Sequence, residues 1–345
     1  MRRIIRFIIF VMSIGIFKFF TLPNTLLPSS IQKRTEKDDT GGAGATNTSS
    51  NKSAGSRVSC GGGSDDRDFD FLRRALTTPC KKQGYSRGNQ DCQLDNIFKN
   101  IGTTNKYYVE YAKEKCSGSG PNTCKLWKEQ GWNGLLLDGD NENPEINLHS
   151  HYLYGNNAAD VLQQYDVPQD LDVLSGDMDS HYLFVMDHIL DHYSPRIVTT
   201  WYNQNWPKEF MLLSHVDPTL VTGPKGSFKF EGCIWGASAS ALNHLLESKG
   251  YVLVGVTPGL DLFWGRRDLF EGCFDVPFFE EYEPLMNLLG RPMHYKQRDV
   301  NFLDKLVDTK VWKETGDIEL ARDAARTALM KNMKSDAILP CLSEV

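Results

Sequence analysis

Acidic residues follow three short apolar runs of the chain, at positions where buried strands would end. Glu110 follows the run YYV, Asp138 follows three consecutive leucines, and Asp177 and Asp179 follow the run LDVLSG. A carboxylate after a strand can accept hydrogen bonds from both hydroxyls of a ribose, or act as a general base toward a hydroxyl group. These residues predict a small-molecule site, with Asp138 at the place where nucleotide-binding folds hold a ribose.

Two further features of this region leave alternatives open. Gly118 and Gly120 lie in the loop after Glu110, where they either let the chain approach a cofactor or serve a turn closed by a disulfide. Asp138–Asp140 and Asp177–Asp179 have Asp-x-Asp spacing, which suits a divalent cation that bridges a nucleotide diphosphate. The second pair could equally cap the helix that follows it.

The pattern of short apolar runs and helix-like stretches predicts an α/β domain with a doubly wound, largely parallel sheet. In such a sheet the carboxyl ends of the strands meet at one edge, so the acidic residues should lie together there. Strands are predicted at 107–110, 134–137, 171–174, 196–200, 251–256 and 261–264. Helices are predicted at 122–130, 158–165, 182–191 and 237–248, with a charged amphipathic helix or helix pair at 301–334.

Composition narrows the classes of function and compartment. The 345 residues carry a net charge of -6, which argues against a nucleic-acid partner because no basic surface is implied. None of the eight cysteines forms a CxxC pair, so no metal site is expected from them. If the chain is exported to an oxidising compartment, as its first 22 residues predict, an even number of cysteines indicates disulfides. The expected pairs are Cys80–Cys92, Cys116–Cys124 and Cys233–Cys273.

The first 22 residues predict attachment to a secretory-pathway membrane. MRRIIR precedes the apolar run FIIFVMSIGIFKFFTL, which indicates a signal anchor with a lumenal carboxyl side. A cleaved signal peptide is the alternative. A flexible stem with two glycan acceptor sequons is expected at 23–66, a folded domain at 67–300 and a helical tail at 301–345. The compartment would be the Golgi or the endoplasmic reticulum, with the cell surface or secretion as alternatives.

Three segments resemble the FkbM-type methyltransferase-like family. They are YYVEYAKEKCSGSGPNTCKLWKEQGWNGLLLDGDNENPEINLH, DVPQDLDVLSGDMDSHYLFVMDHILDHYSPRIVTTWYNQNWP and SALNHLLESKGYVLVGVTPGLDLFWGRRDLF, which together cover about half of the chain. The resemblance implies a class I methyltransferase (Rossmann-like) sheet, S-adenosylmethionine as cofactor, and O-methyl transfer to a sugar or another small hydroxyl compound. It places Glu110 and Asp138 at the cofactor, the latter at its ribose, and Asp177 and Asp179 on the reaction side. Gly118, Gly120 and Asp177 are further candidates for contact with the cofactor.

The chain departs from that family at the strand ends. Ala112 stands where the family has a glycine, Gly176 where it has an apolar residue, Tyr182 where it has an aspartate, and Trp201 where it has a glutamate. Such changes fit either a site that has lost its cofactor or one rebuilt for another ligand. Two further functions therefore stand beside a methyltransferase: a lumenal glycosyltransferase with an Asp-x-Asp metal site, and a non-catalytic binding module.

Overall fold

The structure is a computed structural model that describes residues 68, 70–78, 80, 84–88, 90–111, 116, 120–176, 178, 182–206, 212–214, 236–286 and 302–332. The strands are β1 (Tyr107–Tyr111), β2 (Asn133–Asp138), β3 (Leu148–Ser150), β4 (Val173–Gly176), β5 (Ile197–Trp201), β6 (Leu212–Ser214), β7 (Gly236–Ala237), β8 (Tyr251–Val256), β9 (Asp261–Arg266) and β10 (Val307–Asp308). The α-helices are α2 (Phe71–Thr77), α3 (Gln90–Ile101), α4 (Cys124–Gln130), α5 (Ala158–Gln164), α6 (Tyr182–Leu190), α7 (Ala239–Ser248), α8 (Arg267–Phe270), α9 (Phe279–Tyr282), α10 (Phe302–Lys305), α11 (Thr309–Thr315) and α12 (Ile318–Asn332). Two short 3-10 helices, η1 (Pro144–Ile146) and η2 (Glu283–Leu285), complete these elements.

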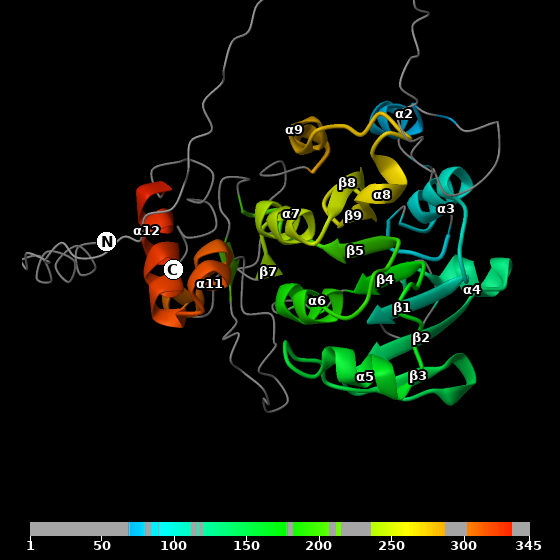
Figure 1. Cartoon of the computed structure of the whole chain (residues 1–345), viewed down its shortest axis with the longest axis horizontal. Helices are drawn as coiled ribbons and strands as arrows, with labels where there is room; N and C mark the ends of the chain where they lie inside the picture. The colour runs from blue at the N-terminus through cyan, green and yellow to red at the C-terminus, as the bar shows by residue number, and fades with distance from the viewer. Residues whose placement is uncertain are drawn as a thin grey trace, which may run out of the picture. The chain divides into compact units, whose positions relative to one another are not determined.

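A seven-stranded sheet forms the centre of the fold, in the order β3-β2-β1-β4-β5-β9-β8 (Figure 1). Strands β1 to β5 pair in parallel and follow the order 3-2-1-4-5 of doubly wound sheets. Strand β9 is antiparallel to both of its neighbours, β5 and β8. The predicted largely parallel sheet is therefore confirmed, with one reversed strand that the sequence pattern did not indicate.

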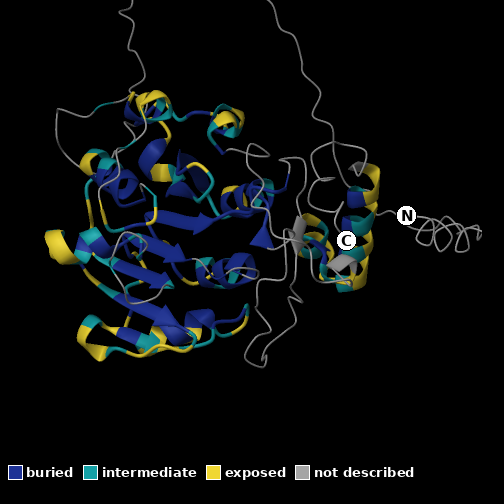
Figure 2. Cartoon of the chain, turned by 180° about the vertical axis from the view of Figure 1, so that it is seen from behind, coloured by how far each residue is buried: buried dark blue, intermediate teal, exposed yellow. Residues whose placement is uncertain are grey.

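Helices cover both faces of this sheet, because successive side chains of a strand point to opposite faces. In β2, Leu135 and Leu137 belong to the core cluster that contains residues of α5, α6 and α7, whereas Leu136 belongs to the cluster with residues of α2, α3 and α4. The central strands are buried on both sides and the outer helix surfaces are exposed (Figure 2). Strands buried on both faces are uninterrupted apolar runs, which explains why LLL and YVLVGV were readable as strands.

The predicted elements lie within a few residues of the observed bounds, and the structure adds others, among them one strand and one helix that border the site. Strand β3 and helix α3 were not predicted. Strand β3 has three residues and gives too little pattern to recognise, and the apolar residues of α3 are interrupted by buried polar ones such as Gln90 and Asp91. Helix α4 ends at Gly131, which adopts a left-handed conformation with φ 67° and so closes the helix before β2 begins.

The segment 302–332 packs onto the α/β core. Strand β10 pairs with β6 in a second sheet of order β10-β6-β7, and α11 contacts α7. Val307 and Ala321 are buried in the same core cluster as residues of α5, α6 and α7. The helix pair predicted for this part of the chain is present as α11 and α12, which are joined through Gly316 at φ 67°.

Two of the predicted disulfides are confirmed. Cys80 and Cys92 are bonded with their Cα atoms 6.0 Å apart, and Cys116 and Cys124 with theirs 5.8 Å apart. Cys273 is disulfide-bonded, while Cys233, its predicted partner, lies outside the described residues.

The predicted membrane anchor at 1–22 and the stem at 23–66 also lie outside the described residues. Within the part of the chain that the structure describes, no helix is both long enough and apolar enough to span a bilayer.

Candidate functional site

The carboxyl edge of the sheet carries the ends of four neighbouring strands. Strands β2, β1, β4 and β5 end at Asp138, Tyr111, Gly176 and Trp201, respectively. Glu110 lies one residue before the end of β1, in register with Leu136 of β2 and Ser175 of β4. The topology thus brings Glu110 and Asp138 to one edge, as predicted.

Other predicted site residues are placed only in part. Gly118, Asp177 and Asp179 lie outside the described residues. Gly120 forms an isolated bridge with Ser86, and its amide donates a hydrogen bond to the Tyr85 carbonyl at 3.0 Å. The loop is therefore tied to residues 85 and 86 at this point, and a contact of Gly120 with a cofactor stays a prediction.

Glu110 is buried, and groups of the protein itself donate hydrogen bonds to both oxygens of its carboxylate. Oε1 accepts from the Asn122 amide at 2.7 Å and the Ser175 hydroxyl at 3.1 Å. Oε2 accepts from the Thr123 amide at 2.9 Å and the Thr123 hydroxyl at 2.6 Å. Four donors match the acceptor capacity of a carboxylate, so the side chain fastens the start of α4 to β1 and β4.

The pKa of Glu110 records two opposing effects. Burial disfavours the charged carboxylate and raises its pKa, while the hydrogen bonds from Thr123, Asn122 and Ser175 lower it. Burial is the larger of the two effects, so the pKa lies above its ordinary value. Because its acceptor sites are occupied, Glu110 acts as a structural group that shapes the edge.

Asp138 is also buried, and the described residues donate to one of its two oxygens. Oδ1 accepts from the Asp140 amide at 2.8 Å, the Asn141 amide at 3.0 Å and the Asn141 side-chain amide at 2.9 Å. Among the described residues no hydrogen bond reaches Oδ2 of Asp138. One oxygen therefore fixes the side chain in the turn after β2, and the other is left to accept hydrogen bonds from a ligand.

Two tyrosines that sequence reasoning missed enclose the turn after β2. A Cβ atom on Gly139 would lie 2.9 Å from a ring carbon of Tyr152 and 3.2 Å from the Tyr111 hydroxyl, so only glycine leaves room for both rings. The Tyr152 hydroxyl donates to Asp140 Oδ1 at 2.9 Å. Burial, followed by the charge of Asp138, raises the pKa of Tyr111, so its hydroxyl keeps its proton.

Two departures from the family pattern form one packing unit at the end of β4. The Tyr182 ring lies directly over Gly176, where an added Cβ would be 2.5 Å from a ring carbon. Tyr182 is the first residue of α6 and is buried. The ring therefore fills space above the end of β4 that would be open with an aspartate at 182.

Asp261 is an acidic residue of this edge that the sequence analysis did not include. It begins β9 and pairs with Trp201, because β9 runs opposite to β5. The Asn122 side-chain amide donates to Asp261 Oδ2 at 3.0 Å and to the Ser175 hydroxyl at 3.2 Å. Asn122 thereby links α4, β4 and β9, and Trp201 is buried beside this network.

The arrangement is chemically suited to a polar ligand with hydroxyl groups. Within the described residues, no group of three or more His, Cys, Asp or Glu side chains is placed to hold a metal ion. The first Asp-x-Asp pair is turned into its own loop, since Asp138 accepts from the Asp140 amide and Asp140 accepts from Tyr152. Asp138 Oδ2 is an acceptor of this edge to which no described residue donates.

No family model matches this chain, and no curated protein matches it. Among solved structures, it is similar to the MycE methyltransferase from the mycinamycin biosynthetic pathway in complex with Mg, SAH and mycinamycin VI, at 15% identity and TM-score 0.32 over 60% of this chain and 57% of that one. A second structure of MycE, with Mg and SAH, matches at 14% identity and TM-score 0.31 over 58% and 55% of the two chains. The chain thus spans just over half of the length of these proteins.

The seven strands of the main sheet are mixed and mostly parallel, with helices on both faces, as in doubly wound α/β folds.

Proposed function

We propose that the carboxyl edge binds the nucleoside part of S-adenosylmethionine and that the protein is a methyltransferase-like protein. The observation that supports this most directly is Asp138, which is held by three donors on Oδ1 and keeps Oδ2 open at the end of β2. An acidic residue at this strand end holds the ribose hydroxyls in doubly wound nucleotide-binding sheets.

The residues of the edge fit the nucleoside in part. Asp138 supplies an acceptor for ribose hydroxyls, and Gly139 keeps the adjoining turn narrow beneath Tyr111 and Tyr152. Glu110 fits an indirect role, because its four acceptor sites are occupied by Asn122, Thr123 and Ser175. Its contribution is to position the start of α4 and the loop before it.

When bound, S-adenosylmethionine would supply an electrophilic methyl group for transfer to an oxygen. The acceptor we propose is a sugar or another small hydroxyl compound. This chain's part in the reaction is to orient the acceptor hydroxyl and remove its proton. Asp177 and Asp179, which follow β4, remain the proposed orienting or proton-accepting groups.

One observation favours a second function, a non-catalytic binding module. The Tyr182 ring covers the end of β4 and depends on Gly176 for its place. A cofactor that extends from Asp138 over β4 would have to pass this ring. If the ring blocks that path, the edge has room only for a polar ligand smaller than the cofactor.

We also propose that the domain faces a secretory lumen and is attached to its membrane through residues 1–22. Support comes from the Cys80–Cys92 and Cys116–Cys124 disulfides, because such bonds persist in oxidising compartments. The apolar run FIIFVMSIGIFKFFTL after three arginines supports the anchor.

Thermal unfolding of the full-length protein with S-adenosylhomocysteine tests the proposed cofactor. A ligand present at about a hundred times its Kd stabilises the native state by about 2.7 kcal/mol, which is readily measured. Asp138→Asn should remove this stabilisation, because the amide that replaces one oxygen cannot accept the ribose hydrogen bonds. Asp140→Asn, which loses the same charge two residues away, is the matched control and should retain it.

The other functions have their own outcomes in the same assay. Stabilisation by a nucleotide sugar that requires manganese would replace the proposal with a glycosyltransferase. If neither ligand changes the melting temperature, the non-catalytic binding module becomes the favoured function. Stabilisation by S-adenosylhomocysteine that survives Asp138→Asn would show that the ribose assignment is wrong.

A further inference from the structure

A cavity lined mostly by polar residues lies at the opposite edge of the sheet from Asp138. It has a volume of about 470 Å³ and is lined by residues of α5, the loop into β4 and the segment after α6. Strands β4 and β5 begin at Val173 and Ile197, directly after these loops, so the cavity is at their amino ends. It is separate from the edge that carries Asp138, and its size falls in the range of about 300 to 1,000 Å³ that is usual for small-molecule sites.

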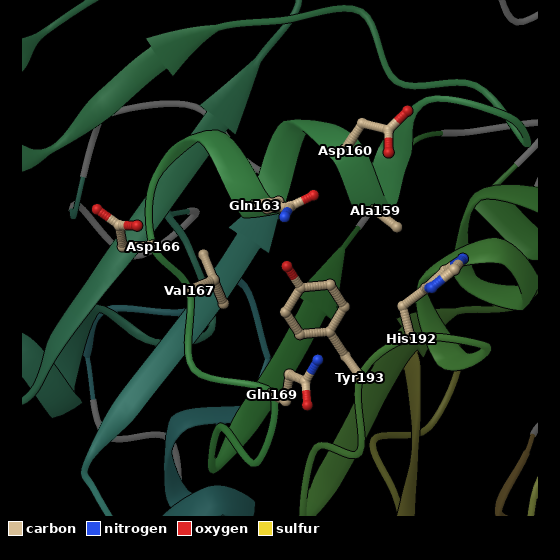
Figure 3. A pocket seen from close by; sticks show the side chains of 8 residues that line it. All are labelled: Ala159, Asp160, Gln163, Asp166, Val167, Gln169, His192 and Tyr193. Atoms are coloured by element: carbon tan, nitrogen blue, oxygen red, sulfur yellow. The ribbon is translucent and has the colours of Figure 1, made fainter.

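Tyr193, whose side chain is mostly buried, lines this cavity. The Tyr193 side chain is 7% exposed, and its hydroxyl forms no hydrogen bond within the described part of the chain. Figure 3 shows the ring rising into the cavity, with the hydroxyl toward Gln163 and Val167. The hydroxyl oxygen itself is accessible from the cavity, so a bound ligand can reach it as a donor or an acceptor.

The walls carry negative charge and hydrogen-bond acceptors. Asp160 and Asp166 line the cavity and form no ion pair with any described residue, and no lysine or arginine is among the lining residues. Gln163, Gln169 and His192 add polar atoms (Figure 3). Burial raises the pKa of Tyr193, as does the charge of Asp160, so the phenol stays neutral and can either donate or accept.

We propose that this cavity binds a small organic molecule through a primary ammonium group. An ammonium group has three donors and one positive charge: the Tyr193 hydroxyl can accept one of its hydrogen bonds, and the carboxylates of Asp160 and Asp166, on opposite sides of Tyr193 (Figure 3), make its surroundings negative. A neutral sugar is less suited, because Tyr193 is too deeply buried to offer its ring face for stacking. Since the cavity is at the amino edge, this proposal holds independently of the function proposed for the carboxyl edge.

Calorimetric titration of the full-length protein in mild detergent tests the proposal with two matched pairs of probes. The pairs are 1,4-diaminobutane against 1,4-butanediol, and glucosamine against glucose. The ammonium member of at least one pair should bind about tenfold more tightly than its neutral analogue, a difference of about 1.4 kcal/mol. Binding of the diamine alone indicates a free amine as the ligand class, and binding of glucosamine alone indicates an amino sugar.

Substitutions of the lining residues test whether the probes bind in this cavity, and their melting temperatures show whether each variant is folded. Asp160→Asn, Asp166→Asn and Tyr193→Phe should each weaken binding about threefold or more, whereas Glu145→Gln, which removes an exposed carboxylate elsewhere, should not. Asp160 and Asp166 are exposed, so their variants should keep the melting temperature of the parent protein. Equal binding of ammonium and neutral probes, no saturation below about 20 mM, or unchanged binding in the Asp160→Asn/Asp166→Asn double variant would overturn the proposal.

Discussion

Two neighbouring strand ends of the same sheet use a buried carboxylate in different ways. At the end of β1, Glu110 accepts hydrogen bonds on both oxygens from Asn122, Thr123 and Ser175. At the end of β2, Asp138 accepts three hydrogen bonds on Oδ1, and the described residues leave Oδ2 without one. Described residues thus donate to both oxygens of one carboxylate and to one oxygen of the other.

The comparison shows that position at the carboxyl edge is not enough to assign a binding role. Glu110 accepts from the amides of Asn122 and Thr123, the two residues directly before α4, whose amides make no hydrogen bond inside that helix. Asp138 precedes a tight turn, whose amides approach from one side and reach only one oxygen. The number of donors around each carboxylate, more than its place in the sheet, separates a structural group from a candidate ligand.

The largest expected effect is on Glu110. Glu110→Ala leaves two amides and two hydroxyls without their acceptor in a buried site, and it should lower the free energy of unfolding by about 3 kcal/mol or more. Glu110→Gln keeps one oxygen and the side-chain size, so its loss should be smaller. Urea denaturation measures both variants. If Glu110→Ala lowers the free energy of unfolding by less than about 1 kcal/mol, Glu110 does not hold its four donors in a buried site.

Gly176→Ala should have the next largest effect. A Cβ atom 2.5 Å from the Tyr182 ring forces the ring or the strand to move, at a cost of about 1 to 3 kcal/mol. In a Tyr182→Ala background the same change should cost little, because the clash is gone. Denaturation of the four proteins of this double-mutant cycle measures the coupling, and additive losses would show that the two residues do not pack together.

Asp138 should affect stability less and ligand binding more. Asp138→Ala removes the acceptor of three hydrogen bonds at a partly open site, so it should cost about 1 to 2 kcal/mol. Asp138→Asn can keep an oxygen for the Asp140 and Asn141 amides, and it should cost less while still preventing ribose binding. Equal losses of stability in the two variants would mean that Oδ1 does not organise the turn.

The smallest expected effect is the pH dependence of the free energy of unfolding that comes from His151, the residue directly after β3. The His151 amide donates to the Asp138 carbonyl at 2.8 Å, and its ring lies 2.7 Å from the Tyr165 hydroxyl. Burial is the main cause of the lowered pKa of His151, and the charge of His149 lowers it further. The unfolded chain therefore takes up the proton first as the pH falls. The stability that this histidine contributes above pH about 6.5 is lost as the pH falls through its folded pKa.

Thermal unfolding between about pH 7 and about pH 5 measures this response. His151→Gln, which can still bond to Tyr165, should lose less stability over this range than the parent protein. An identical pH response of the two proteins would contradict the assignment to His151.

Much of the fold could be predicted because it depends on local pattern. The runs LLL and YVLVGV are buried on both faces, and their length and flanks identify strands without knowledge of their neighbours. The local disulfides Cys80–Cys92 and Cys116–Cys124 follow from short separation along the chain. Strand β3 could not be recognised, because its three residues acquire meaning only through pairing with β2.

The candidate site was predictable in residue type but not in function. Glu110 and Asp138 stand at the predicted edge, yet nothing in the sequence shows that one has four donors and the other three on a single oxygen. Asp261 escaped prediction for a different reason. It precedes an apolar run, and only the reversed direction of β9 brings the start of that run to the carboxyl edge.

The sequence by itself determined most strands of the main sheet, its largely parallel order and the edge at which Glu110 and Asp138 meet, because hydrophobic periodicity and burial act over a few neighbouring residues. The tertiary structure alone decided how many donors reach each carboxylate, that Tyr182 lies over Gly176, and that Tyr193, Asp160 and Asp166 line one cavity. These features depend on the approach of residues that are distant along the chain, and only packing specifies that approach.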